Sequence, residues 1–333
     1  MTPESSGQLT VAPEGEPDQL ALEAREVINR ARSIERAAAI DGPDEGYFPK
    51  GSTLRKVQAS RAVGLLYGQL GLTIGGTDPL NYVGTSEHTR NRELPFSRLA
   101  ETAEAFETIF FGTRAEADAV AERVFLMHKP VKGEITQDVG THPKGTAYAA
   151  FDPKRMLWTM ACMAYPAVTL YETLEHPLSG NEREDFWQDY VLFGKLFGLS
   201  PYDAPQTYPQ FQQYMKDRFS SGELHLTEAA KEMGKEIAFN TPIPRFPAFA
   251  RKNMNRVLLG LLPEEIRQLY ELEYGPSEKR AFQATVSAIR LGNLTLPRAV
   301  TRGDNSYFFK LVAHEEERLQ GLGQQAVMQA NPY

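Results

Sequence analysis

Hydrophobic positions recur at helical spacing along almost the whole chain. Between Arg114 and Lys129, apolar residues return every three or four positions, and Glu116 and Glu122 lie on the opposite side. A period of about 3.6 residues predicts amphipathic helices, whereas a strand exposed on one side alternates every second residue. No run of alternating β-branched residues stands out. The pattern therefore predicts an all-α fold, a single multi-helix bundle.

Local start and stop signals set the predicted bounds of these helices. Pro95 suits a first helical turn, Gly112 suits the position after a helix end, and Thr113 can cap the next helix. The predicted helices span Asp18–Ala39, Ser52–Ile74, Asp78–Arg92, Pro95–Phe111, Arg114–Lys129, Pro153–Glu175, Ser179–Phe197, Tyr208–Phe219, Thr227–Ile237, Pro247–Leu259, Pro263–Glu273 and Ser277–Ile289. Gly133–Phe151, rich in glycine and proline, predicts a long loop of a kind that is often functional.

Composition and the absence of linkers in the sequence predict how the chain is organised into domains. The 333 residues are 41% hydrophobic and 24% charged, as in soluble globular proteins. No linker divides the chain, so we expect one domain over residues 17–330 after a disordered tail, residues 1–16, which lacks the apolar core of a secretion signal. The longest uncharged runs, Ala62–Thr77 and Met156–Tyr171, fall short of the ~20 apolar residues of a membrane span. They predict buried core helices and a cytoplasmic protein.

Charge and cysteine content exclude several functions. The 36 basic and 43 acidic residues give a net charge of −7 with no basic tract, which argues against nucleic-acid binding. The single cysteine, Cys162, excludes a disulfide within the chain and any multi-cysteine metal site, and its apolar surroundings predict a core residue. The H-E-x-x-H motif of zinc hydrolases and the G-x-S-x-G motif of serine hydrolases are both missing from the sequence.

His128 stands out because it lies on the apolar side of a predicted helix, in line with Ala117, Ala121, Val124 and Phe125. An imidazole that faces the interior is costly unless its nitrogens find partners. A carbonyl, a carboxylate or a metal would serve. The pattern therefore leaves two interpretations open, a hydrogen-bonded core histidine and a metal ligand.

Arg98 and Thr102 lie one turn apart at the edge of another apolar stripe. An arginine in this position can reach a buried anion such as a propionate, a phosphate or a carboxylate. The alternative is an arginine whose stem covers the core while its head pairs with Glu101, Glu104 or Glu107.

Seven segments, in order, resemble one family, which pools the bacterial latex-clearing rubber oxygenases with the fungal oxygenase that cleaves the farnesyl chain in mycophenolic acid biosynthesis. The resemblance covers residues 46–289. Its segments read GYFPKGSTLRKV, FSRLAETAEAFETIFFGT, MHKPVKG, YAAFDPKRMLW, LSGNEREDFWQDY, DAPQTYPQFQQYM and NRVLLGLLPEEIRQLY.

The resemblance implies a helical bundle that encloses a haem b. It implies that His128 is the proximal ligand of the haem iron and that Arg98 and Thr102 lie at the haem site. A haem would satisfy both residues, since iron takes an imidazole nitrogen and propionates accept from an arginine. The residues expected around the ring are Phe106, Phe110, Val124, Met127 and Trp158.

One departure from the rubber oxygenases changes the expected chemistry. Their distal iron ligand is a lysine immediately before the matched threonine, and this chain has Glu101 there. A carboxylate could leave the distal position open to dioxygen or peroxide, act there as an acid or base, or point away. Rubber cleavage is therefore not implied.

The sequence thus predicts a haem-dependent oxygenase or oxidase. We expect it to use dioxygen or peroxide on an apolar or amphipathic small molecule, such as a specialised metabolite. Two alternatives stay open: a non-catalytic haem or small-ligand binding protein, and a helical interaction protein without cofactor. Neither the substrate nor the oligomeric state can be predicted.

Overall fold

The computed structural model describes residues 45–88, 94–303 and 305–323. The predicted tail, residues 1–16, and the predicted helix Asp18–Ala39 lie outside the described residues. The described part is mostly helical, which confirms the predicted all-α class.

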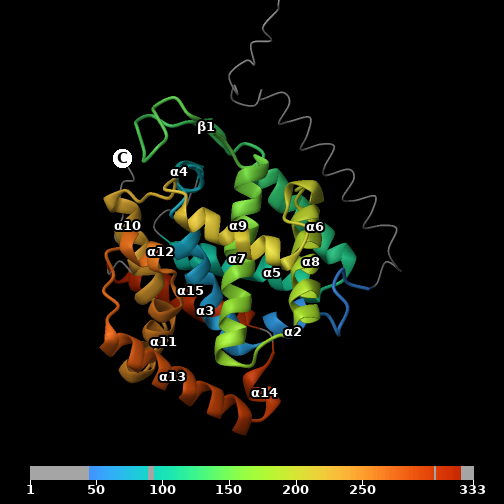
Figure 1. Cartoon of the computed structure of the whole chain (residues 1–333), viewed down its shortest axis with the longest axis vertical. Coiled ribbons are helices and arrows are strands. Elements are labelled where there is room, and N and C mark those ends of the chain that lie inside the picture. The colour runs from blue at the N-terminus through green and yellow to red at the C-terminus, as the bar shows by residue number, and fades with distance from the viewer. Residues whose placement is uncertain (1–44, 89–93, 304, 324–333) are drawn as a thin grey trace, which may run out of the picture.

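Fourteen named α-helices and one 3-10 turn make up most of the described chain (Figure 1). They are α2 (Thr53–Gln58), α3 (Arg61–Gly75), α4 (Pro79–His88), α5 (Pro95–Phe111), α6 (Arg114–His128), α7 (Pro153–Leu174), α8 (Gly180–Leu196), η1 (Pro201–Asp203), α9 (Tyr208–Ser220), α10 (Glu228–Phe239), α11 (Ala248–Leu261), α12 (Glu264–Leu269), α13 (Pro276–Thr295), α14 (Arg298–Thr301) and α15 (Ser306–Gly321).

Helices α3 and α7 form the centre of the bundle. A Cβ placed on Gly71 of α3 would lie 2.7 Å from the carbonyl oxygen of Cys162 in α7, so only glycine allows this approach. That carbonyl lacks its usual helical donor, because Pro166 four residues later has no N–H. The two helices therefore meet backbone to backbone, which confirms that the two long uncharged runs form buried core helices.

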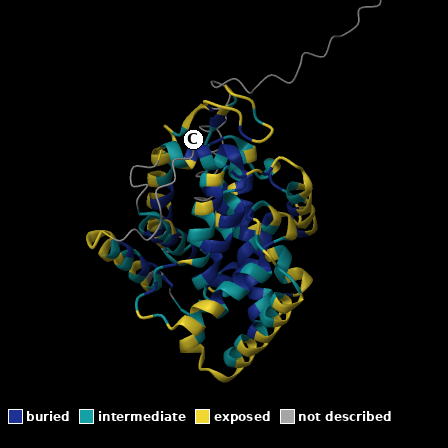
Figure 2. Ribbon diagram, turned by 90° about the vertical axis from the view of Figure 1, so that its left-hand side faces the viewer, coloured by how far each residue is buried: buried dark blue, intermediate teal, exposed yellow. Residues whose placement is uncertain are grey.

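The core follows this axis, and exposed residues cover the outside of the bundle (Figure 2). Trp158, Tyr171 and Trp187 are among the largest fully buried side chains. Cys162 is 4% exposed, as predicted, and burial raises the pKa of its thiol well above the usual value. The thiol is thus a neutral core group.

The segment predicted as a loop contains a short hairpin, so the prediction of no strands is wrong in this place. Strand β1 (Lys132–Glu134) pairs antiparallel with β2 (Ala147–Ala149), and Gly133 lies opposite Tyr148. Tyr148 packs in a second small cluster with α4. Strands of three residues are too short to reveal an alternating pattern, which explains the error.

Several bounds also differ from the prediction: α12 ends at Leu269 instead of Glu273, and α13 continues to Thr295 instead of ending at Ile289. The helix expected over Ser52–Ile74 is broken at Ala59–Ser60, where the Ser60 hydroxyl donates to a carboxylate oxygen of Glu175 at 2.7 Å. A serine that bonds to a distant helix starts a new helix here instead of continuing the old one. The chain after Leu294 forms α14 and α15, which the periodicity did not define.

None of the described helices combines the length and the apolar character needed to cross a bilayer.

Candidate functional site

The start of α5 is held by a carboxylate from α15. Glu316 is 1% exposed and accepts from the backbone N–H groups of Phe96 at 3.0 Å and Ser97 at 2.7 Å. The Ser97 hydroxyl donates to the same carboxylate at 2.9 Å. Burial raises the pKa of Glu316, while these bonds favour its charged form. The cap fixes the backbone one residue before Arg98.

A two-residue turn joins α5 to α6. A Cβ on Gly112 would lie 2.5 Å from the carbonyl oxygen of Thr108, so the turn needs a glycine. Thr113 caps α6 as predicted: its hydroxyl accepts from the N–H of Glu116, whose carboxylate accepts from the N–H of Thr113. These bonds lower the pKa of Glu116. The turn therefore fixes the relative orientation of α5 and α6, the two helices that carry the candidate residues.

Arg98, Glu101 and Thr102 lie on adjacent turns of α5. The Thr102 hydroxyl donates to the carbonyl of Arg98 at 2.9 Å, and both Thr102 and Glu101 are exposed. Arg98 is half-buried. Burial lowers the pKa of its guanidinium, and the negative charges of Glu101 and Glu316 oppose this shift. Within the described residues the guanidinium makes no hydrogen bond or ion pair, so its five donors remain available.

His128 is the last residue of α6, and its side chain is exposed. The expectation that it faces the interior is therefore wrong. The buried stripe of α6 runs through Ala117 and Ala121 and fades to half-buried at Val124. Periodicity gives the side of a helix on which a residue lies, and it does not say whether another element covers the last turn.

The His128 ring is nevertheless oriented. Its Nδ1 lies 2.8 Å from the carbonyl oxygen of Val124, one turn earlier. A carbonyl can only accept, so Nδ1 carries the proton and Nε2 is the basic nitrogen of the neutral ring. The same bond commonly orients histidines that bind metals through Nε2.

The aromatic and apolar residues expected around a haem divide into two groups. Phe106 is half-buried, with its ring edge-on to Phe193 at 5.4 Å, and Val124 is half-buried on α6. Met127 is 59% exposed beside His128. These three residues lie on α5 and α6.

Trp158 belongs to a different part of the molecule. Its indole N–H donates to the carbonyl of Gly75 at 3.3 Å, and the guanidinium of Arg218 lies over its ring at 4.9 Å. These contacts are with the end of α3 and with α9. The structure therefore does not bring Trp158 together with the α5–α6 residues.

Beside Trp158 lies a polar cluster that the sequence did not reveal as a unit, the Asp78 network (Asp78, Arg155 and Arg218). Asp78 is 1% exposed, and its carboxylate accepts from Arg155 at 2.5 Å and from Arg218 at 2.8 Å. It also caps α4 by accepting from the N–H of Asn81 at 3.0 Å. The Asp78-Pro79 pair signals a helix start, but nothing local indicates two arginines from α7 and α9.

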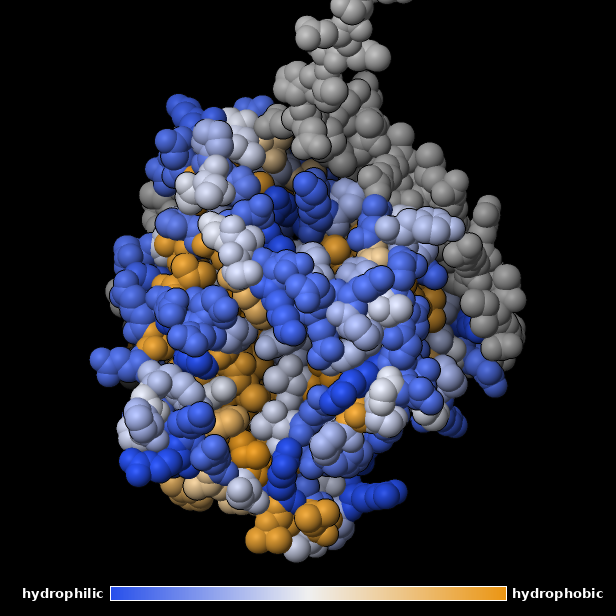
Figure 3. Space-filling view, in the orientation of Figure 1, coloured by the Kyte–Doolittle hydropathy of each residue, from blue (hydrophilic) through white to orange (hydrophobic). Residues whose placement is uncertain are grey.

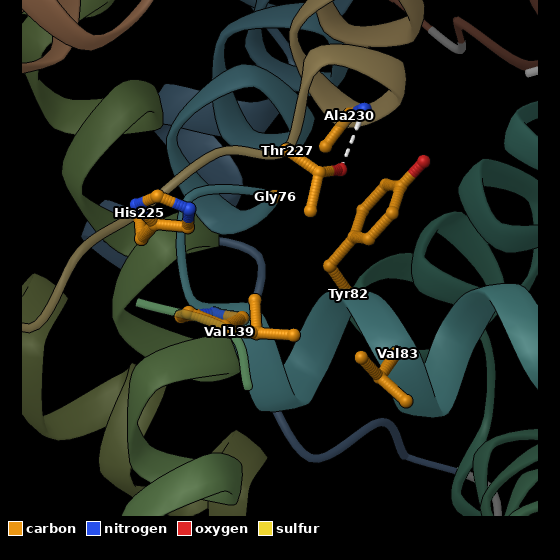
Figure 4. A pocket seen from close by; sticks show the side chains of 8 residues that line it. Gly76, Tyr82, Val83, Val139, His225, Thr227 and Ala230 are labelled. Atoms are coloured by element: carbon orange, nitrogen blue, oxygen red, sulfur yellow. Dashed lines mark hydrogen bonds between the residues drawn. The ribbon is translucent and has the colours of Figure 1, made fainter. Parts of the chain in front are cut away.

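A small hollow lies between α4, the hairpin loop and the start of α10 (Figure 4). Tyr82 and Thr227 face it, and the hydroxyl of Thr227 accepts from the N–H of Ala230 at 3.2 Å. The enclosed volume of about 10 Å³ has room for about one water molecule. Its lining residues do not come from α5 or α6, so it is not the candidate site.

The described residues contain no group of three or more histidine, cysteine, aspartate or glutamate side chains placed to hold a metal ion. A haem iron differs from such ions because a single axial histidine is enough to hold it.

The fold is thus a helical bundle in which consecutive helices present one oriented histidine and one arginine whose guanidinium makes no hydrogen bond or ion pair with the described residues. The chain belongs to the family described as "ER-bound oxygenase mpaB/B'/Rubber oxygenase, catalytic domain", whose model matches residues 55–291. This confirms the family resemblance, and the protein therefore carries an oxygenase catalytic domain.

Two mycobacterial relatives are similar over a shorter stretch. One is an uncharacterised protein of Mycobacterium tuberculosis and the other an uncharacterised protein of Mycobacterium bovis. Each is 24% identical over 204 residues, which cover 61% of this chain and 76% of the relative. No solved structure matches the chain.

The α5–α6 residues suit a haem in their donor chemistry. His128 offers a basic Nε2 held in place from Nδ1, and Arg98 offers unused donors for a carboxylate. Met127, the residue before His128, is 59% exposed. His128 and Met127 are exposed on the outside of α6 and Arg98 is half-buried on α5, whereas the sequence predicted a site enclosed by the bundle.

Proposed function

We propose that this protein is a haem-dependent oxygenase that acts on an apolar or amphipathic small molecule, and that His128 would hold the iron of a haem b. The observation that carries the proposal is the bond from Nδ1 of His128 to the Val124 carbonyl, 2.8 Å long. It sets the tautomer that iron needs and leaves Nε2 available. Family membership supports the oxygenase chemistry.

Haem, when bound, supplies the activation of dioxygen or peroxide. Arg98 would bind a propionate, because its half-buried guanidinium has no acceptor within the described residues. Thr102 would steady that arginine through its bond to the Arg98 carbonyl. The surface formed by Phe106, Val124 and Met127 would cover one side of the macrocycle.

Glu101 occupies the sequence position that the distal lysine has in the rubber oxygenases. It is exposed on the same helix as Arg98, so its carboxylate can exchange protons with solvent. We assign it the task of delivering or accepting a proton during turnover. The protein would act inside the cell on a diffusible substrate, in keeping with the cytoplasmic location expected from the sequence.

An absorption spectrum of the purified full chain tests the proposal. After expression with ample iron and haem precursor, we expect a Soret band that shifts on reduction. His128→Ala should lose most of the band, while His314→Ala, another exposed histidine at a distance in sequence, should keep it. A colourless wild-type protein, or equal bands in both variants, would contradict the assignment of His128.

Turnover separates catalysis from simple haem binding. We expect oxygen or peroxide consumption that depends on an added apolar substrate. Glu101→Gln should lower this rate by about 10²-fold, the lower end of general acid–base effects, while leaving the haem content unchanged. A protein that binds haem but consumes neither oxidant with a broad panel of apolar substrates would instead be a haem-binding protein.

A further inference from the structure

The end of α13 and the whole of α14 carry an unusual exposed surface. Residues 294–300 are all exposed. The larger apolar side chains of this region are Leu291 at 63%, Leu294 at 84%, Leu296 at 50% and Val300 at 54% exposure. We call these four residues the α13–α14 patch. Figure 3 shows hydrophobic side chains gathered at this end of the molecule.

Helix geometry turns the leucines of α13 away from the bundle. The inner side of α13 packs on the core through Phe282, Val286 and Ile289. At 100° per residue, Leu291 lies on the opposite side of the helix from these residues, and Leu294 lies on its flank. They are therefore not core residues that the fold has failed to cover.

The end of α13 is also rigidly attached. The guanidinium of Arg290 donates to the carbonyls of Thr173 at 2.7 Å and Glu172 at 2.9 Å, at the C-terminal end of α7. The side-chain amide of Asn293 donates to the carbonyl of Leu174 at 3.2 Å. The leucines thus lie on a helix end that is already attached to the bundle, so the backbone of α13 does not have to become ordered when they bind.

The charge around the patch has the opposite sign to that of the chain. From residue 290 to residue 302 there are three arginines and no acidic residue, a local charge of +3 in a chain of −7. Arg302 is partly committed to Glu175 at 4.0 Å. Arg298 is exposed, and its guanidinium has no partner within the described residues. The next acid along the chain, Asp304, lies outside the described residues.

We propose that the α13–α14 patch docks on an anionic membrane surface, with the leucines in the acyl boundary and Arg298 at the lipid headgroups. Exposed leucines beside basic residues are typical of interfacial attachment without a membrane span. The local positive charge favours this partner over a second copy of the chain, since a symmetric contact between two copies would bring the same arginines together. The proposal goes beyond the proposed oxygenase activity and does not depend on bound haem.

Cosedimentation of the full chain with vesicles tests the proposal. We expect binding to vesicles of phosphatidylcholine with about a third of phosphatidylserine, weaker binding to phosphatidylcholine alone, and loss of binding in high salt. Leu291→Ser combined with Leu294→Ser should weaken the partition more than about tenfold, as two leucines lose their apolar contact. Arg298→Gln should weaken it about fivefold.

Matched variants outside the patch serve as controls. Leu322→Ser replaces a leucine of equal exposure, 62%, which follows α15 at the end away from α14. Lys216→Gln removes an exposed positive charge on α9. Both should bind like the wild type, and circular dichroism should confirm that all variants fold.

Three results would overturn the proposal. The first is no sedimentation with the anionic vesicles. The second is equal binding by the patch and control variants. The third is concentration-dependent self-association without lipid that the double leucine variant abolishes, because this would assign the patch to contact between two copies of the chain.

Discussion

The Asp78 network and the α5–α6 site use charged groups in opposite ways. Asp78 is almost fully buried, and each of its two arginines is less than one-fifth exposed and directly paired with it. At the α5–α6 site, His128 and Glu101 are exposed, and the Arg98 guanidinium has no partner among the described residues.

This difference separates architecture from candidate chemistry. A buried ion pair with its hydrogen bonds satisfied holds helices together and has nothing left to bind a ligand. Residues with unused donors or acceptors can bind one. In this protein the most conspicuous polar cluster is therefore structural, and the candidate site is the less conspicuous one.

Removing Asp78 gives the largest expected loss of stability. Asp78→Ala leaves Arg155 and Arg218 with no shared carboxylate in a mostly buried place, and we expect a cost of about 3–5 kcal/mol in the free energy of unfolding. Urea denaturation would measure it. Asp78→Asn keeps the cap of α4 and should cost less.

Because the Asp78 network is separate from the α5–α6 site, we expect folded Asp78→Asn protein to bind as much haem per molecule as the wild type. A variant that folds as well as the wild type but loses haem would instead make the Asp78 network part of the binding site.

Removing Glu316 should have a smaller effect on stability and a larger one on the site. Glu316→Ala takes the acceptor from two backbone N–H groups at the start of α5, and we expect a cost of about 2 kcal/mol. The backbone that carries Arg98 loses its anchor, so haem affinity should fall as well. Titration of the apo form with haem, beside Glu315→Ala on the same helix, would measure this fall.

Loss of stability without loss of haem affinity in Glu316→Ala would mean that the cap does not position Arg98.

The smallest expected effect on stability concerns Asp189. It tests whether a buried carboxylate without a paired arginine, unlike Asp78, lowers the free energy of unfolding. Among the described residues, the Asp189 carboxylate accepts a hydrogen bond from the N–H of Leu54 alone, at 3.3 Å, and burial raises its pKa to about 6. The folded protein thus holds the proton more tightly than the unfolded chain. Stability should fall as the pH rises from about 4 through 6.

Asp189→Asn keeps an acceptor for Leu54 and removes the charge. We expect it to raise stability by about 1 kcal/mol at neutral pH and to flatten the fall between pH 4 and 6, as measured by thermal unfolding across pH. A variant less stable than the wild type at pH 7 would show that the Asp189 charge has a partner that stabilises it.

The sequence predicted features that depend on neighbouring residues. Asp152 caps α7 by accepting from the N–H of Lys154 at 2.8 Å, with Pro153 in the first turn, and Thr113 caps α6. Such signals act within a few residues, so a pattern can reveal them. The class of fold followed from helical periodicity for the same reason.

Features that depend on distant contacts could not be predicted. Glu316 caps α5 from 220 residues away along the chain, and the arginines of the Asp78 network come from two other helices. The exposure of His128 depends on what covers the last turn of α6, which is a tertiary property. Helical periodicity singled out His128, Arg98 and Thr102, the family resemblance gave them their roles at a haem, and these roles stay predictions.

The meeting of α3 and α7 ties two distant sequence positions together. Pro166 frees the Cys162 carbonyl, and Gly71 leaves room for the neighbouring helix to approach that oxygen. A side chain at residue 71 would push the helices apart, and an ordinary residue at 166 would draw the oxygen back into its own helix. The effect of a substitution at residue 71 therefore depends on the residue at 166, and the two positions are expected to change together during evolution.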